Sequence, residues 1–194
     1  SITIIILCTM IGAYFLNALA DLLNLRHIDP HLPEEFKNHF DTEKYLKSQS
    51  YLKTTTVFGF IVATVNLAAI LVFWFAGGFE YVDAFVRGLG MNSIITGLMF
   101  TGLLLMMKLA VSLPFSFYST FVIEERFGFN KTTPLLFCTD LVKSILLTAV
   151  LGGGLLALIL SIFQYGGSDA WIFCWVTSAV FLLLVQYIVP TWIM

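Results

Sequence analysis

Long apolar runs alternate with short polar segments along this chain of 194 residues. A helix of about 20 apolar residues crosses the hydrocarbon core of a bilayer, which is roughly 30 Å thick. The pattern therefore predicts an all-α fold, a polytopic transmembrane helix bundle that forms a single membrane domain over residues 1–194. The five expected spans cover about residues 2–25, 54–76, 93–123, 134–164 and 170–194.

The third apolar run, residues 93–123, is too long for one straight crossing. It contains Pro114, and a proline inside a helix removes a backbone hydrogen bond and clashes with the preceding turn. We therefore expect a kink at Pro114, followed by a helical piece that leaves the membrane and ends near Arg126. Thr133 then offers an N-cap and Pro134 a first helical position, which predicts the start of the fourth helix.

The longest polar segment is residues 26–53, which we expect to form an amphipathic loop at the membrane surface. Pro33 can open a short helix as its first residue. Asp41 is a good N-cap for a second helix that runs to Lys53, where the second span takes over. A shorter amphipathic piece is expected at residues 79–86, after the glycines that end this span.

The composition agrees with a membrane protein and argues against a soluble domain. Hydrophobic residues make up 59% of the chain and charged residues only 11%, whereas soluble domains contain about 25% charged residues. A net charge of −2 with no basic patch excludes the electrostatic footprint of a nucleic-acid-binding protein. The three cysteines lie in or beside apolar runs and are interpreted as small buried hydrophobic residues.

The basic residues predict the orientation, because cytoplasmic loops carry an excess of Lys and Arg. Eight of the ten basic residues lie in the first loop and in the third loop with the entry to the fourth span. We therefore expect loops 26–53 and 124–133 and the C-terminus in the cytoplasm, and the N-terminus outside. The eight residues are Arg26, Lys37, Lys44, Lys47, Lys53, Arg126, Lys131 and Lys143.

Two polar features could carry function. Lys108 lies in the middle of a span, where an ammonium group is costly, so it faces the bundle interior or a cavity, or it snorkels to the surface. Glu124, Glu125 and Arg126 end the third span, either as a solvated helix end or as an ionic network at a cavity mouth. Both alternatives stay open on the sequence alone.

No catalytic or metal-binding set can be assembled from these residues. His27 and His31 have the spacing of a zinc helix, but Ile28 stands where the metallopeptidase motif needs Glu, and Pro30 prevents a regular helix between them. The sequence contains no nucleophile elbow, P-loop or dinucleotide fingerprint. We expect no catalytic residue, no metal ligand and no cofactor within the chain.

Two motifs nevertheless match one family. Residues 113–134 read Leu-Pro-Phe-Ser-Phe-Tyr-Ser-Thr-Phe-Val-Ile-Glu-Glu-Arg-Phe-Gly-Phe-Asn-Lys-Thr-Thr-Pro, and the first loop has Pro33, Glu35, Asp41, Glu43, Lys47, Ser48 and Tyr51. These residues resemble the membrane-embedded zinc metallopeptidases of the Ste24 type, CAAX prenyl protease 1 of peptidase family M48. Eukaryotic members tend to have His where this chain has Phe127, so the chain looks like the bacterial branch and a bacterial inner-membrane protein.

The resemblance implies a division of labour. The family's N-terminal region is a five-helix membrane domain that helps to enclose an intramembrane chamber, and its zinc-binding His-Glu-x-x-His helix follows later in the sequence. In the full-length protein the zinc would activate water to cleave peptides, including prenylated ones. The chain starts at Ser1 and stops in an apolar run, so we expect a fragment that lacks the catalytic domain and is inactive by itself.

The resemblance also gives the polar cluster a role. We expect Glu124, Glu125, Arg126 and Asn130, and in addition Lys108, to shape the chamber or to dock the missing domain. The partners would be the bilayer, the catalytic domain and a peptide substrate, and the isolated fragment could self-associate. The rival interpretation is a non-catalytic scaffold, or a small transporter or channel built around Lys108.

Overall fold

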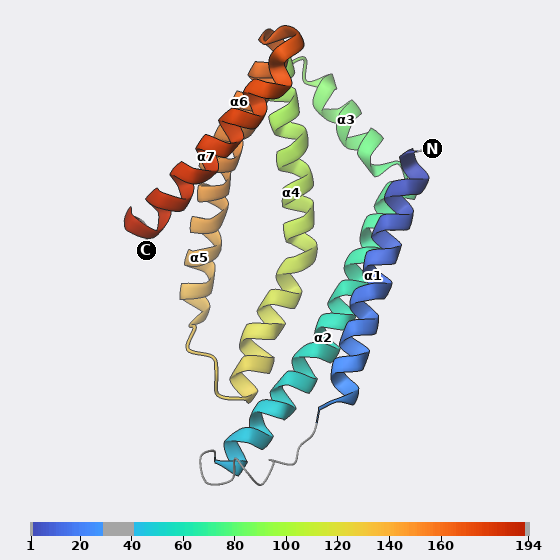
Figure 1. Cartoon of the computed structure of the whole chain (residues 1–194), viewed down its shortest axis with the longest axis vertical. Coiled ribbons are helices and arrows are strands. Elements are labelled where there is room, and N and C mark those ends of the chain that lie inside the picture. The colour runs from blue at the N-terminus through green and yellow to red at the C-terminus, as the bar shows by residue number, and fades with distance from the viewer. Residues whose placement is uncertain (1, 29–40, 193–194) are drawn as a thin grey trace. The chain divides into compact units, whose positions relative to one another are not determined.

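The computed structural model describes residues 2–28 and 41–192, and these residues are helical with short turns and no strand (Figure 1). The all-α prediction is therefore confirmed. In chain order the elements are α1 (Ile2–Arg26), α2 (Thr42–Phe75), α3 (Gly78–Gly88), α4 (Ser93–Tyr118), the π-helix η2 (Ser119–Glu124), α5 (Pro134–Leu147), the π-helix η3 (Thr148–Gly152), α6 (Gly153–Tyr165), the 3₁₀ turn η4 (Gly167–Asp169) and α7 (Ala170–Trp192).

Five stretches of the described residues are long and apolar enough to cross a membrane. Most of their large apolar side chains are exposed, for example Val150 at 70% and Leu182 at 61%. Such faces are expected where lipid rather than water is the solvent. The five-span prediction is confirmed, and the stretches are Ile2–Arg26, Thr42–Phe75, Ser93–Glu124, Pro134–Tyr165 and Gly167–Tyr187.

The predicted boundary at Lys53 is wrong, because α2 is one continuous helix of 34 residues. Asp41 caps it as expected, its side chain accepting a hydrogen bond from the backbone N–H of Glu43 at 3.0 Å. No glycine or proline interrupts the chain between Asp41 and Val57. The threonines at 54–56 donate their hydroxyls to carbonyls of the preceding turn, so these side chains are hydrogen-bonded within the helix. Pro33 and the rest of 29–40 lie outside the described residues.

The third span continues as a helix through Pro114, and the π-helical turn η2 follows it at Ser119–Glu124. The kink expected at Pro114 stays a prediction. π-turns inside helices often mark functional segments. The fourth span likewise contains a π-turn, η3, which ends at the first of three consecutive glycines. Thr133 accepts a hydrogen bond from the backbone N–H of Leu136 at 3.2 Å, and Pro134 occupies the first helical position, as predicted.

The chain divides into two compact units, and the division falls inside α4. The first unit contains residues 1–79 and 108–132. Within it α1 packs along α2, and α2 also contacts η2. Tyr14 and Thr64 share a hydrogen bond of 2.7 Å between α1 and α2. This bond joins two membrane spans through hydroxyl groups.

The second unit contains residues 80–107 and 133–194. Its α6 and α7 form a tight helical hairpin in which Ala170 and Cys174 are buried. The other two cysteines, Cys8 and Cys138, are exposed, so the expectation of buried cysteines is wrong for them. Gly97 of α4 lies so close to α6 that an added Cβ would stand 2.7 Å from a Leu160 methyl carbon. Small residues at such contacts let helices approach closely in lipid.

The expected amphipathic piece near residues 79–86 is confirmed as α3. Its Val86 is fully buried, whereas Tyr81 and Phe85 are exposed. Arg87 donates to Asp83 at 2.7 Å one turn away. This hydrogen bond, and then the carboxylate's charge, raises the pKa of Arg87.

Candidate functional site

The third span ends in a complete Schellman motif at the turn between η2 and α5. Gly128 has a φ of 67°, the left-handed conformation that favours glycine. The N–H of Phe129 donates to the carbonyl of Glu124, and the N–H of Gly128 donates to that of Glu125, each at 2.9 Å. Both bonds are those of the motif, and they satisfy carbonyl groups that the helix end would leave free.

Asn130 ties this helix end to the segment that follows. Its side-chain Nδ2 donates to Glu125 Oε2 at 3.0 Å, and its Oδ1 accepts from the backbone N–H of Thr132 at 2.7 Å. The amide therefore bridges the helix end and the entry to α5. Two of the predicted site residues, Glu125 and Asn130, are in direct contact.

The turn packs on the N-terminal part of α2. Tyr51 meets Phe127 and Phe129 edge to face, with ring centroids 5.4 and 4.9 Å apart. Lys47 Nζ stands 5.7 Å from the centroid of the Phe129 ring, within cation–π range. Ile123 and Phe127 are buried on the same side of the helix end. These contacts, and not an ion pair, hold the third loop to α2 in the described residues.

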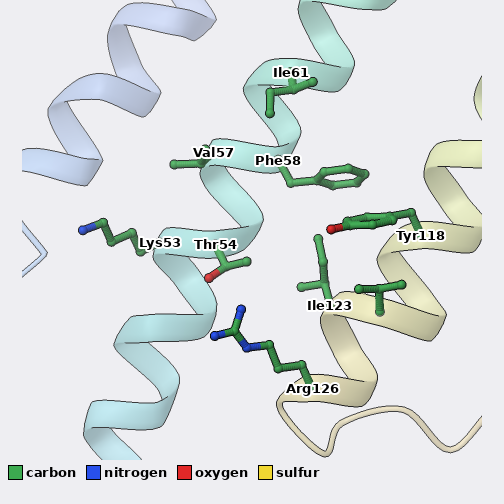
Figure 2. A pocket seen from close by; sticks show the side chains of 9 residues that line it. Lys53, Thr54, Val57, Phe58, Ile61, Tyr118, Ile123 and Arg126 are labelled. Atoms are coloured by element: carbon green, nitrogen blue, oxygen red, sulfur yellow. The ribbon is translucent and has the colours of Figure 1, made fainter.

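A groove of about 350 Å³ opens between α2 and the helix end (Figure 2). Phe58 and Tyr118 stack across it, with centroids 5.2 Å apart and ring planes 29° from parallel. Its lining contains two cations and no carboxylate. The lining residues are Lys53, Thr54, Val57, Phe58, Ile61, Tyr118, Val122, Ile123 and Arg126.

Arg126 gives the groove a polar end. Figure 2 shows its side chain reaching from the helix end towards α2, with the guanidinium on the Thr54 side. Lys53 extends from α2 away from the helix end, so its ammonium group does not meet the guanidinium. Neither cation has an ion pair within the part of the chain that the structure describes.

The predicted site residues fall into separate places. Glu125 and Asn130 form the loop bridge, Glu124 uses its backbone carbonyl in the Schellman motif, and Arg126 faces the groove. Lys108 is exposed on α4. At a helical rise of 1.5 Å per residue, it lies about 24 Å along the helix axis from Glu124. Lys108 is therefore not part of the same cluster.

No group of three His, Cys, Asp or Glu side chains in the described residues could hold a metal ion. The Nδ1 of His27 stands 2.8 Å from the carbonyl of Leu23 and donates to it, since a carbonyl only accepts. His31, its predicted companion, lies outside the described residues. The described ranges, 2–28 and 41–192, therefore do not fit a zinc site.

Sequence reasoning missed the residues that hold the loop in place. Lys47 and Tyr51 were noted as parts of a motif, without a partner. Their spacing of four residues places both on one face of a helix, which could have indicated a shared contact. Arg126 was read with its acidic neighbours, although its side chain serves the groove.

Comparisons with known proteins agree with this geometry. A family model described as the N-terminal part of CAAX prenyl proteases, with five membrane helices, matches residues 21–194. The chain is 36% identical over 178 residues to CAAX prenyl protease 1 of Saccharomyces cerevisiae, covering 84% of this chain and 38% of the yeast protein. It is 33% identical over 192 residues to an Arabidopsis thaliana homologue, covering 93% and 45%.

A solved structure is also similar. The crystal structure of Ste24p from S. mikatae matches with a TM-score of 0.86 and 32% identity, covering 95% of this chain and 45% of that chain. The chain thus spans less than half the length of these three relatives. The resemblance carried by the two sequence motifs is confirmed. The chain belongs to the CAAX prenyl protease N-terminal family of peptidase M48 and is an integral-membrane domain of the Ste24 type.

Proposed function

We propose that residues 1–194 form one domain that serves a zinc metalloendopeptidase of the CAAX prenyl protease type, as part of its chamber wall. The observation that carries the proposal is the family match over residues 21–194. The 36% identity to a protein named CAAX prenyl protease 1 supports it. The rival, a channel or scaffold built around Lys108, has no comparable support.

The catalytic chemistry belongs to residues outside these 194. The sequence contains no His-Glu-x-x-His, and the described residues do not fit a zinc site. The chain supplies helices and a fixed cytoplasmic turn, and the zinc-binding part and a peptide substrate, prenylated or not, are its partners. By itself the chain is inactive.

The turn of residues 124–130 faces the cytoplasm in this proposal, together with loop 26–53 and the C-terminus. The cation–π contact of Lys47 with Phe129 supports a common side for the first and third loops. The two loops are also the basic ones. Phe127 supports a place in a bacterial inner membrane, through the family resemblance.

A split enzyme tests the proposal. The Arabidopsis relative is divided at the end of its matching segment, and its C-terminal part is expressed with either its own N-terminal part or this chain. We expect zinc-dependent cleavage of a farnesylated CAAX peptide from both pairs and none from any part alone. Activity in the native pair but not in the chimeric pair would contradict the proposal, as would activity of this chain alone.

A further inference from the structure

We propose that the groove between α2 and the end of the third span binds an anionic phospholipid, with its phosphate at Arg126 and one acyl chain along Phe58, Tyr118 and Ile61. The proposal concerns the chain's own surface and does not depend on proteolysis. It rests on the charge of the groove, on its position along the helices and on its shape.

The charge of the groove favours an anion. Its nine lining residues include Arg126 and Lys53 and no acidic residue. Of these two cations Arg126 reaches across the groove, whereas Lys53 extends away from the helix end (Figure 2). The carboxylate of Glu125, the residue before Arg126, accepts a hydrogen bond from Asn130 and is engaged on the loop. A guanidinium is a planar fork that matches a phosphate group with two parallel hydrogen bonds. Arg126 forms the polar end of the groove, with its guanidinium on the Thr54 side (Figure 2).

Along the membrane normal, the charged end of the groove lies at the level of lipid headgroups and its apolar part at the level of acyl chains. Lys53 and Arg126 flank the apolar stretches of α2 and of the third span, at the level of the headgroups. From there the groove continues past Val57, Phe58 and Tyr118 to Ile61, which are apolar or aromatic. An amphiphile with an anionic head therefore meets matching chemistry at both ends.

The shape of the groove suits a chain and not a free ion. Its volume of about 350 Å³ is at the lower end of the range for small-molecule sites, about 300–1,000 Å³. The stacked rings of Phe58 and Tyr118 form an apolar wall that presents their ring edges, against which methylene groups can lie. Inorganic phosphate would use only the Arg126 end and leave this wall empty.

Native mass spectrometry of the full 194-residue chain tests the site. The chain is released from micelles that hold equal amounts of phosphatidylglycerol and phosphatidylcholine, and the ratio of the two retained lipids is measured. We expect one phosphatidylglycerol to be retained in preference. R126Q lowers this preference about fivefold, the usual effect of one basic side chain at a membrane surface. K131Q is the matched control, because Lys131 is an exposed cation of the same loop that does not line the groove.

Two further variants separate the charge from the groove. I61W obstructs the apolar end and lowers retention of phosphatidylglycerol while both cations remain; Ile61 is 49% exposed, so the larger side chain does not disturb a core. R126K keeps the positive charge and serves as the test variant if R126Q does not fold. We expect it to retain an intermediate preference for phosphatidylglycerol. Each of these results supports the site when the helical content matches that of the parent chain.

Four results would overturn the assignment. Equal loss of preference in K131Q would show a diffuse surface attraction. Equal retention of both lipids by the parent chain would show no headgroup recognition. Unchanged retention in I61W would show that the groove holds no acyl chain. Tighter binding of a farnesylated peptide carboxylate than of phosphatidylglycerol, lost in R126Q, would make the groove a peptide site.

Discussion

Tyr51 of α2 and Phe129 of the third loop meet edge to face, with ring centroids 4.9 Å apart and ring planes at 69°. The same Tyr51 ring meets Phe127 on the other side of Gly128. One aromatic side chain thus holds both residues that flank the glycine of the helix end. The turn that carries Glu125 and Asn130 is fixed on α2 through this ring.

Replacing Tyr51 should loosen the turn. Y51A removes two aromatic pairs, each contributing about 0.5–1.5 kcal/mol beyond the area that it buries. We expect faster amide hydrogen exchange at residues 124–132 and a lower unfolding temperature in detergent. Y51F keeps both ring contacts and should behave like the parent chain. Equal exchange in Y51A and the parent chain would show that the turn does not depend on the ring.

Gly128 should not tolerate a side chain. G128A forces a left-handed conformation on alanine, which costs about 1–2 kcal/mol. An added Cβ would stand 3.5 Å from Lys47 Nζ, an ordinary contact, so the cost comes from the backbone. G59A is the control, because Gly59 lies inside α2 with open space around it and helical Ala is favoured over Gly. Denaturant unfolding should rank G59A at or above the parent chain and G128A below it.

The hydrogen bond between Tyr14 and Thr64 should couple α1 to α2. Hydrogen bonds between membrane helices contribute about 0.6 kcal/mol on average and at most about 1.7. A double-mutant cycle with Y14F and T64V should give a coupling energy in this range, measured from unfolding in mixed micelles. Strictly additive effects of the two substitutions would show that the bond adds nothing to the packing of the helices.

The loop bridge should matter to an enzyme that contains this domain. N130A removes the amide that joins Glu125 to the backbone of Thr132. In a full-length relative, alanine at the positions of Glu125 and Asn130 should lower kcat/KM for a CAAX peptide several-fold at unchanged zinc content. Alanine at the position of Glu80, an exposed acidic residue of α3, is the control. Full activity and an unchanged fold in the N130A and E125A enzymes would exclude a docking role.

The sequence predicted the spans well because apolar length alone decides which segments cross a bilayer. Caps were also predictable, since Asp41 and Thr133 act through hydrogen bonds to their own helices. The predicted end of the second loop helix at Lys53 was wrong, because the polar character of residues 42–53 was taken as a change of element. A helix continues through a change of solvent as long as no residue breaks it.

The candidate site was harder to predict because its contacts join segments far apart in the chain. Lys47 and Phe129 are separated by more than eighty positions, and the local sequence around either residue does not predict their contact. Glu124, Glu125 and Arg126 are consecutive, so successive positions on a helix point in different directions. The three residues therefore do different things: Glu124 accepts backbone hydrogen bonds, Glu125 binds Asn130, and Arg126 lines the groove.

The uninterrupted course of α2 has a mechanical consequence. Its 34 residues give a length of about 51 Å at 1.5 Å per residue, against a hydrocarbon core of roughly 30 Å. The N-terminal part of α2 thus extends beyond the hydrocarbon core and carries Lys47 and Tyr51, which contact the third loop. The length of α2 therefore sets how far the turn of residues 124–130 lies from the membrane. Inserting or deleting one residue in 43–53 would rotate the α2 face that carries Lys47 and Tyr51 by about 100°.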